Sequence, residues 1–201
     1  MANLIYTTLS AVIYPPFNRK LTDIRGLEHI PASGGYLIAS NHVDWLDGFF
    51  IGATIQKYRK VPAHFLTKSN NYWWTTVAVK IPVDRSMIVD AAITKLKNGL
   101  VICNFPEGVR NESKKLLPGK TGTVRMAAES DIPVIPAGIA CEAGRNMRQS
   151  WQFLFSKRHQ VSLSFGEPLK FNIPPGGISS EWLESETRRL MRVIASLCAK
   201  I

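Results

Sequence analysis

Cysteine is scarce in this sequence, and the three cysteines, Cys103, Cys141 and Cys198, are odd in number and far apart. Small disulfide-stapled domains carry many paired cysteines, and zinc sites need ligands at short, regular spacings. The sequence therefore fits neither class. The apolar neighbours of the three residues predict buried free thiols in a reducing compartment.

The sequence also lacks a hydrophobic run long enough to cross a membrane. A spanning helix needs ~20 apolar residues, and the stretch 4–17 is shorter and contains Thr7, Thr8, Pro15 and Pro16. It has no basic leader and no small-residue cleavage site, so it does not match a signal peptide. If the protein acts on lipids, we expect it to lie on the bilayer. The expected place is cytoplasmic, peripheral on the inner face of the membrane.

Acidic residues are outnumbered, since 15 Asp and Glu face 25 Lys and Arg and leave a formal net charge of +10. Such an excess favours anionic partners, whether nucleic acid, anionic lipid or phosphorylated small molecules. The composition is 45% hydrophobic and 20% charged, as in ordinary globular proteins. Zinc-finger, aromatic RNA-binding and recognition-helix patterns are missing, so nucleic acid is not an expected partner.

Short apolar runs alternate with segments of helical periodicity. The β-branched runs are bounded by Gly, Pro or Asn and predict strands, whereas Ser86 and Ser180 are plausible helix caps. This alternation predicts an α/β fold: a single domain over residues 1–201 with a mixed, mostly parallel sheet flanked by helices. The expected strands are 35–40, 63–67, 81–83, 100–104, 132–139 and 160–165, and the expected helices are 45–56, 86–97, 121–129 and 178–200.

His42 and Asp47 are the first candidate site residues. They follow the expected strand 35–40, and strand ends often carry functional side chains on a rigid scaffold. On one helix they would point ~140° apart, but they can meet if His42 lies in the loop and Asp47 in the first helical turn. A histidine held by a carboxylate can take the proton of a hydroxyl nucleophile. Taken alone, the pair also fits a loop histidine beside a helix-capping aspartate, and Asp44 could cap that helix too.

The residues after the expected strand 100–104 form a second candidate. Pro106 lacks an N–H group and Gly108 can take a positive φ, so the strand should end in a sharp turn. Arg110 offers a planar fork that matches phosphate oxygens. Glu107 could bind an acceptor hydroxyl or orient Arg110. A surface turn with an ion pair remains the alternative at this point.

Lys120 and Arg85 lie at the ends of expected elements. Lys120 stands between Gly119 and Gly122 at the start of a helix, where free N–H groups and the helix dipole favour anions. Arg85 follows the expected strand 81–83. A single basic residue is usually only solvated, so these two gain interest from the other candidates near them.

In this order the segments resemble the glycerolipid acyltransferase superfamily, and in particular the bacterial 1-acyl-glycerol-3-phosphate acyltransferases. The family's first block, Asn-His with an Asp five residues after the His, matches Asn41, His42 and Asp47. No single segment is decisive, but several in family order are specific. The similarity covers about residues 26–169, followed by a C-terminal helix at about 178–200. The matching segments are 26–31, 41–47, 81–85, 105–113, 120–122, 132–136 and 165–169.

The sequence departs from this family at several positions. Val109 stands where Thr usually precedes the arginine, Gly119 where Phe usually precedes the lysine, and Pro82 where a bulky apolar residue is common. Many relatives carry a long hydrophobic N-terminal extension, of which this chain has little. We expect these differences to affect the choice of acceptor more than the chemistry.

The resemblance implies direct acyl transfer to the free hydroxyl of a lysophospholipid, with 1-acyl-glycerol-3-phosphate the leading acceptor. His42, oriented by Asp47, would take the hydroxyl proton, and the oxygen would attack the thioester of acyl-CoA or acyl carrier protein. These donors are co-substrates, and no metal or bound cofactor is implied. The residues that would bind the acceptor are Arg85, Glu107, Gly108, Arg110 and Lys120.

A membrane surface is a further expected partner. The basic charge favours anionic lipid, and the segment 72–74, Tyr-Trp-Trp, could anchor at the headgroup level, as could residues 4–17. Other acceptors remain open, such as glycerol-3-phosphate, a lyso-aminolipid or a glycolipid. A basic nucleic-acid- or lipid-binding protein without catalysis is the alternative from another class. It would explain the charge but not the placement of His42, Asp47 and Glu107.

Overall fold

The computed structural model describes residues 2–67, 79–80, 87–111, 115–141, 146–157 and 160–199. Its strands are β1 (Leu21–Arg25), β2 (Tyr36–Ser40), β3 (Ala63–Thr67), β4 (Val79–Lys80), β5 (Val101–Asn104), β6 (Val134–Ala140) and β7 (Val161–Phe165). They form one sheet in the order β1-β7-β6-β2-β5-β3-β4. Neighbouring strands are parallel except β6 and β7, which are antiparallel. The expected α/β fold with a mixed, mostly parallel sheet is confirmed.

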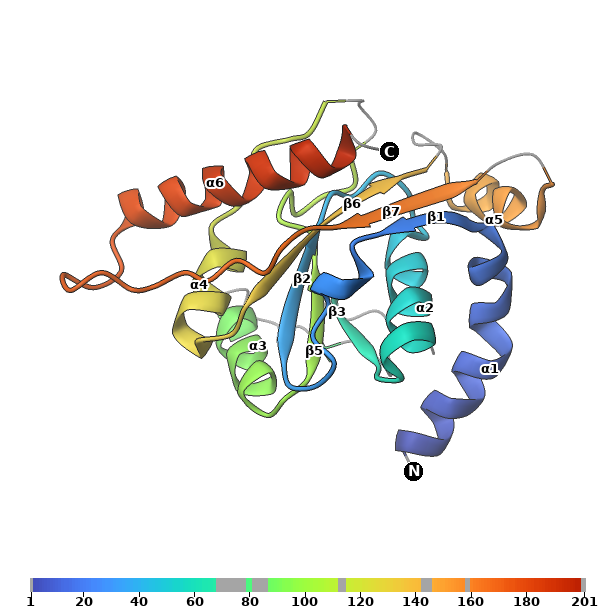
Figure 1. Ribbon diagram of the computed structural model, residues 1–201, viewed down its shortest axis with the longest axis horizontal. Helices are drawn as coiled ribbons and strands as arrows, with labels where there is room; N and C mark the ends of the chain where they lie inside the picture. The colour runs from blue at the N-terminus through green and yellow to red at the C-terminus, as the bar shows by residue number, and fades with distance from the viewer. Residues whose placement is uncertain are drawn as a thin grey trace.

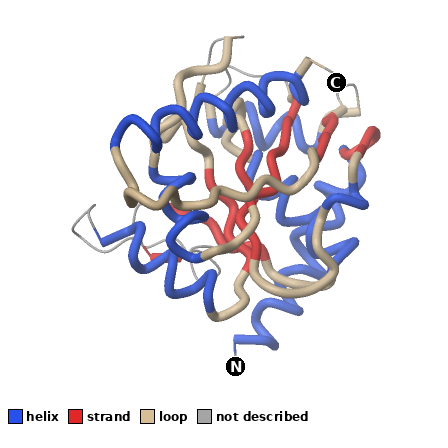
Figure 2. Tube along the Cα trace, turned by 60° about the vertical axis from the view of Figure 1, so that its left-hand side comes forward, coloured by secondary structure: helices blue, strands red, loops and turns tan. Residues whose placement is uncertain are grey.

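Helices cover both faces of this sheet (Figure 1). They are α1 (Ala2–Lys20), α2 (Asp47–Arg59), α3 (Met87–Lys97), α4 (Gly122–Ser130), α5 (Met147–Phe155) and α6 (Ser180–Cys198), with a short 3-10 turn η1 (Leu27–His29). One face carries α1, α2 and α5, and the other carries α3, α4 and α6. Figure 2 shows the strands running through the interior between these helices.

The central strand β2 shows why the sheet needs cover on both faces. All five of its residues are buried, and successive side chains of a strand point to opposite faces. Tyr36 and Ile38 pack in the core beneath α1, α2 and α5, whereas Leu37 and Ala39 pack in the core beneath α3, α4 and α6. A continuous apolar run of this kind is typical of a parallel strand buried on both sides.

The predicted elements within the described residues are all present, with ends shifted by a few residues. The cap of α6 is Ser179, whose side chain accepts the N–H of Trp182 at 3.1 Å, rather than the expected Ser180. Cys103 is a buried free thiol, as expected, whereas Cys141 and Cys198 are only partly buried and do not fit that expectation. The expected strand 81–83, the expected cap Ser86 and the aromatic segment 72–74 lie outside the described residues.

Several of the described elements were not predicted: the helices α1 and α5, the strand β1, and the short elements η1 and β4. Pro15 and Pro16 lie inside α1, and prolines in a helix interior remove hydrogen bonds, so local preference argues against this helix. Burial of Tyr14 and Phe17 against α2 compensates for that cost. None of the helices in the described part of the chain is long and apolar enough to span a bilayer.

Candidate active site

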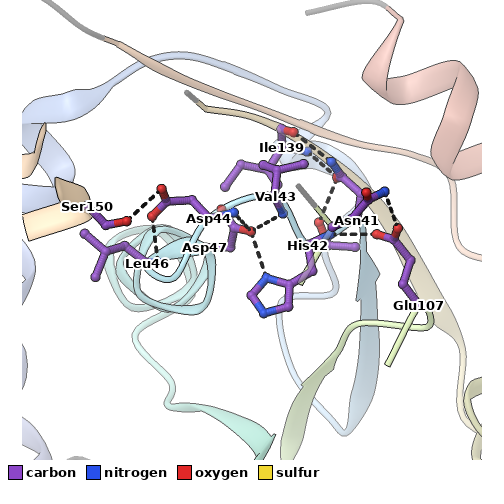
Figure 3. A network of polar contacts seen from close by, with 11 residues as sticks. Asn41, His42, Val43, Asp44, Leu46, Asp47, Glu107, Ile139 and Ser150 are labelled. Atoms are coloured by element: carbon purple, nitrogen blue, oxygen red, sulfur yellow. Dashed lines mark hydrogen bonds and ion pairs between the residues drawn. The ribbon is translucent and has the colours of Figure 1, made fainter. Parts of the chain in front are cut away.

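The carboxyl ends of β2 and β5 lie side by side, because the two strands pair in parallel with Ala39 opposite Asn104. The loop after β2 begins with Asn41, which is buried and held at both ends of its amide. Its Nδ2 donates to the carbonyl of Ile139 at 2.9 Å, and its Oδ1 accepts the N–H of Ile139 at 2.8 Å. The start of the loop is thereby tied to β6 (Figure 3).

His42 and Asp47 meet across this loop, 2.9 Å apart from Nδ1 to Oδ2. His42 lies in the loop and Asp47 is the first residue of α2, which is the arrangement that their spacing required. The same Oδ2 accepts the N–H of Val43 at 2.7 Å and that of Asp44 at 2.8 Å. Asp47 is fully buried, whereas the side chain of His42 stays 21% exposed. The histidine ring is therefore fixed by Asp47, as Figure 3 shows, and remains partly accessible to solvent.

The backbone N–H groups of Val43 and Asp44 both donate to Oδ2 of Asp47, and an ionised carboxylate beside Nδ1 of His42 can only accept a further hydrogen bond. Nδ1 of His42 thus carries the shared proton, which leaves a lone pair on Nε2 for a substrate. Burial raises the pKa of the Asp47 carboxyl, while the hydrogen bond and charge of His42 and the N–H of Asp44 lower it again. The pair is suited to general-base chemistry at Nε2.

Asp44 fixes the far side of the loop. Its Oδ1 accepts the N–H of Leu46 at 2.9 Å, immediately before α2, so its side chain serves the helix entry although the cap position itself is Leu46. Its Oδ2 accepts the hydroxyl of Ser150 in α5 at 2.9 Å. Asp44 and Ser150 are both fully buried, so losing either would leave a buried polar group unpaired.

Glu107 joins the turn after β5 to the loop that carries His42. Its Oε1 accepts the backbone N–H of His42 at 2.9 Å, and its Oε2 accepts Nδ2 of Asn111 at 2.7 Å and the N–H of Leu117 at 3.0 Å. The N–H of Asn111 in turn donates to the carbonyl of His42 at 2.7 Å. Both backbone polar groups of His42 are therefore held. These contacts show that Glu107 positions His42, a role that was not expected. Binding of an acceptor hydroxyl or orientation of Arg110 by Glu107 stays a prediction.

The turn after β5 also shapes the space in front of the histidine. The ring of Phe105 stacks on the His42 ring, with centroids 4.1 Å apart and planes 15° apart. Gly108 has the expected positive φ, 72°. A Cβ at Gly108 would lie 2.7 Å from Nζ of Lys120, so the lysine side chain passes directly over this glycine. The backbone N–H of Lys120 donates to the carbonyl of Pro106 at 2.8 Å.

The side chains of Arg110 and Lys120 lie beside different elements. The guanidinium of Arg110 lies 4.9 Å from the ring centre of Trp45, just ahead of α2, a distance suited to a cation–π contact. Lys120 is exposed and lies just ahead of α4. Arg85 lies outside the described residues, so convergence of all three on one anion stays a prediction.

Sequence reasoning missed the residues that hold the His42 loop in place. Asn41 and Asn111 stood in recognised blocks without a role, and Ser150 drew no attention. Ser150 follows Asn146 and Gln149, which form a capping box at the start of α5, a pattern that the sequence does contain. Its contact with Asp44 spans 106 positions, and no local pattern reports such a pairing.

Sequence comparisons match the same region. A family model described as Acyltransferase matches residues 22–140. The 1-acyl-sn-glycerol-3-phosphate acyltransferase of Bacillus subtilis (strain 168) is 31% identical over 152 residues, which are 71% of this chain and 70% of that protein. The 1-acyl-sn-glycerol-3-phosphate acyltransferase alpha of Mus musculus is 27% identical over 174 residues, 80% of this chain. The chain spans only 56% of that longer mouse protein.

A solved structure has the same fold. The crystal structure of the 1-acyl-sn-glycerophosphate (LPA) acyltransferase PlsC from Thermotoga maritima superposes with a TM-score of 0.64. The match covers 98% of this chain and 81% of that chain, at 22% sequence identity. The arrangement of helices and strands around the His42 loop is thus an architecture already seen in a solved protein.

Proposed function

The chain belongs to the acyltransferase family, and from this premise we propose that it transfers a fatty acyl group from a thioester to the free hydroxyl of 1-acyl-glycerol-3-phosphate, giving phosphatidic acid. The observation that carries the proposal is the contact of 2.9 Å between His42 and the buried Asp47, inside the matched region. The names of the bacterial and mouse relatives support this acceptor.

The proposed reaction proceeds by direct transfer. Nε2 of His42 takes the proton of the acceptor hydroxyl, and the oxygen attacks the thioester carbonyl carbon to form a tetrahedral intermediate. Collapse breaks the carbon–sulfur bond, and the leaving thiolate takes the proton back from the His42 imidazolium to leave as a thiol. Asp47 stabilises the imidazolium between the two proton transfers.

Glu107 and Asp47 prepare this step without touching the substrate. Asp47 fixes the tautomer and the plane of the ring, and Glu107 with Asn111 fixes the backbone from which the ring projects. Phe105 covers one face of the ring, so Nε2 can move little relative to the bound reactants. Holding a base in a reactive geometry supplies a large part of the rate that enzymes achieve.

We propose that the acceptor phosphate binds in front of the turn after β5, at Gly108 and Lys120, and that Arg110 and Arg85 converge on it there as further cations. A phosphate monoester carries nearly two negative charges at neutral pH, so a desolvated one needs several donors. Arg110 supplies a planar fork, and Lys120 supplies a point charge over a glycine that lacks a side chain. In this proposal the acyl donor is acyl-CoA or acyl carrier protein, and no metal or prosthetic group takes part.

The proposal includes a place on an anionic membrane surface, on the cytoplasmic inner face. The support is a set of exposed apolar side chains beside the His42 loop, which we call the aromatic face: Trp45, Met147, Trp151 and Phe155. The last three are spaced by four residues and so share one side of α5. Phe155 is 72% exposed. The neighbouring Arg148 and Lys157 are exposed and basic, which suits anionic headgroups.

A thiol-release assay with long-chain acyl-CoA or acyl carrier protein and a panel of lysolipids tests the function. Phosphatidic acid, identified by mass spectrometry, is the expected product, formed fastest with 1-acyl-glycerol-3-phosphate. A glycolipid or lyso-aminolipid used equally well would move the assignment to another acceptor. Binding of lipid with no thiol release by either donor would favour a binding protein without catalysis.

Vesicle co-sedimentation tests the membrane part. We expect binding to anionic vesicles at low salt that weakens at high salt, because exposed charges are screened. Phe155→Ser should reduce binding about ten-fold or more, since burying an exposed Phe contributes ~1.5–3 kcal/mol. Ile173→Ser is the matched control, because Ile173 is 46% exposed but lies away from α5. Equal losses for both variants, or equal recovery with neutral and anionic lipid, would contradict the aromatic face as the contact.

A further inference from the structure

A broad hollow lies between α6 and the segment that leads from the catalytic turn to α4. It encloses about 1720 Å³ and is open to solvent. One wall is formed by residues 115–121 and the other by the side of α6 that carries Thr187, Met191 and Ala195. We call it the α6 groove. In Figure 1 the yellow-green segment before α4 runs beside the red helix α6.

The α6 groove is strongly basic. Among the residues that the structure describes, Lys115, Lys120, Arg188 and Arg192 line it, with Glu184 as the single carboxylate. Arg188 lies 3.6 Å from Glu184, and both side chains are more than half exposed, so this ion pair is weak and leaves the arginine available to another anion. Arg188 and Arg192 are one helical turn apart on the same side of α6. A lining of this kind attracts a ligand with several separated negative charges.

The groove begins at the catalytic turn. The N–H of Leu117 donates to Glu107 at 3.0 Å, and the other oxygen of the same carboxylate accepts the N–H of His42 at 2.9 Å. Nζ of Lys120 lies over Gly108 at the end of the groove. A ligand lying along the groove therefore has one end beside the turn that holds His42.

The floor of the groove is apolar and closely fitted. A Cβ at Gly119 would lie 2.7 Å from the sulfur of Met191 and 3.1 Å from Cγ2 of Thr187. Gly119 thus allows α6 to approach where the resembling family usually has Phe. Thr187 is 3% exposed, and its Oγ1 has no hydrogen-bond partner within the described residues.

We propose that the α6 groove binds the phosphate-bearing arm of the acyl donor, a phosphopantetheine thioester. This inference rests on the proposed function. The acceptor brings a single phosphate, which the residues in front of the turn suit. The donor brings a long polar arm and phosphate groups at a distance from the thioester. The volume of the groove, about 1720 Å³, suits such an extended ligand, because it exceeds the ~300–1,000 Å³ of pockets that hold compact ligands. Both coenzyme A and acyl carrier protein present this arm.

The test is the double variant Arg188→Ala/Arg192→Ala. We expect the KM for the donor to rise at least about ten-fold, because two charge-assisted contacts to phosphate are lost, while the KM for the acceptor and kcat stay near their wild-type values. The matched control is Lys97→Ala/Arg125→Ala, which removes two exposed cations that do not line the groove. Ala195→Glu is an independent second variant, because it adds a negative charge at an exposed lining position.

Three donors separate the possible sources of the effect: acyl-CoA, acyl carrier protein and the acyl thioester of N-acetylcysteamine, which has no phosphate. We expect no change in KM with the phosphate-free donor. A rise with acyl-CoA alone assigns the groove to the nucleotide carrier, and a rise with acyl carrier protein alone assigns it to the protein carrier. An unchanged donor KM, a rise in the acceptor KM only, or an equal rise with the phosphate-free donor would overturn the proposal.

Direct binding separates this inference from the proposed reaction. Titration calorimetry of His42→Ala protein with coenzyme A and with holo-acyl carrier protein should show binding that Arg188→Ala/Arg192→Ala weakens about ten-fold. Such binding without any transferase activity in the wild type would refute the proposed function but support the groove as the donor site. Transferase activity, together with equal donor affinity in the presence and absence of the two arginine substitutions, would support the proposed function but refute the groove as the donor site.

Discussion

The loop that carries His42 and the α6 groove differ in how their charged side chains are placed: those around the loop are buried, and those of the groove are exposed. Around the loop, the carboxylates of Asp44, Asp47 and Glu107 are buried and held by donors at 2.7 to 3.0 Å. In the groove, the charged side chains are long, exposed and loosely paired. Proton transfer needs reacting atoms in fixed positions, whereas attraction of a phosphate acts over several ångströms of water. A chemical step thus requires burial and order, and capture of a charged ligand does not.

The largest effect should come from His42→Ala. Removal of the base should lower kcat by ~10²–10⁴-fold, the range that general-base catalysis supplies. The fold should survive, because the side chain is 21% exposed. Steady-state thiol release with a thermal unfolding curve measures both. His29→Ala, outside the site, serves as the control. A folded His42→Ala protein with near-normal turnover would show that the ordered loop is not catalytic.

Asp47→Asn should separate activity from stability within the loop. The amide cannot stabilise the imidazolium, so we expect kcat to fall at least about 10²-fold. The fold should gain stability at neutral pH, because burial raises the pKa of Asp47 and the folded state disfavours its charged form. Because the pKa of Asp47 is higher in the folded than in the unfolded protein, the protonated carboxyl stabilises the fold at pH values below the ordinary pKa of ~3.9. This stabilisation is lost as the pH rises through the pKa of the folded protein.

Denaturant unfolding between pH 4 and pH 8 measures this effect, with ~3.9 as the lower end of the window. The difference in unfolding free energy, Asp47→Asn minus wild type, should increase with pH. A difference that shrinks toward neutral pH would mean that the hydrogen bonds from His42 and the loop outweigh burial in setting the Asp47 pKa.

Glu107→Ala should damage both stability and rate. It leaves the N–H groups of His42 and Leu117 without their acceptor, whereas the amide of Asn111 still donates to the carbonyl of Lys115, and each unpaired N–H group costs ~1–3 kcal/mol. We expect the free energy of unfolding to fall by ~2–4 kcal/mol and kcat to fall in the protein that remains folded. Glu107→Gln keeps one acceptor oxygen and should lie between. If Glu107→Ala changed only the KM for the acceptor, the result would support the direct contact between Glu107 and the acceptor hydroxyl that the sequence predicted.

Arg110→Ala should have the smallest and most selective effect. We expect the KM for the acceptor to rise about ten-fold with little change in the KM for the donor, because Arg110 faces the acceptor phosphate in the proposal. Arg110→Lys should recover part of the loss, since the planar fork is missing. Separate acceptor and donor titrations measure both constants. An unchanged acceptor KM would remove Arg110 from the phosphate site.

The sequence predicted what local patterns encode. β2, β3, β5, β6 and β7 followed from their apolar runs, and the meeting of His42 with Asp47 followed from their spacing beside a strand end. Residues whose partners are distant were not predictable. Glu107 reads as a surface carboxylate until the pairing of β5 with β2 places it under His42. The helix α1 contradicts the local preference of Pro15 and Pro16, and only its packing against α2 explains it.

The pairing at the edge of the sheet has a consequence for the order in which the strands fold during synthesis. β1 pairs with β7, and Nζ of Lys20, at the end of α1, donates to the carbonyl of Ser156 across 136 positions. β7 leaves the ribosome well after β1, whereas α2, against which α1 packs, leaves it much earlier. Until residues 161–165 have emerged, β1 lacks the strand that it pairs with, and such long-range pairings form slowly. The strand β1 is therefore among the last to be placed in the sheet, although it is synthesised long before β7.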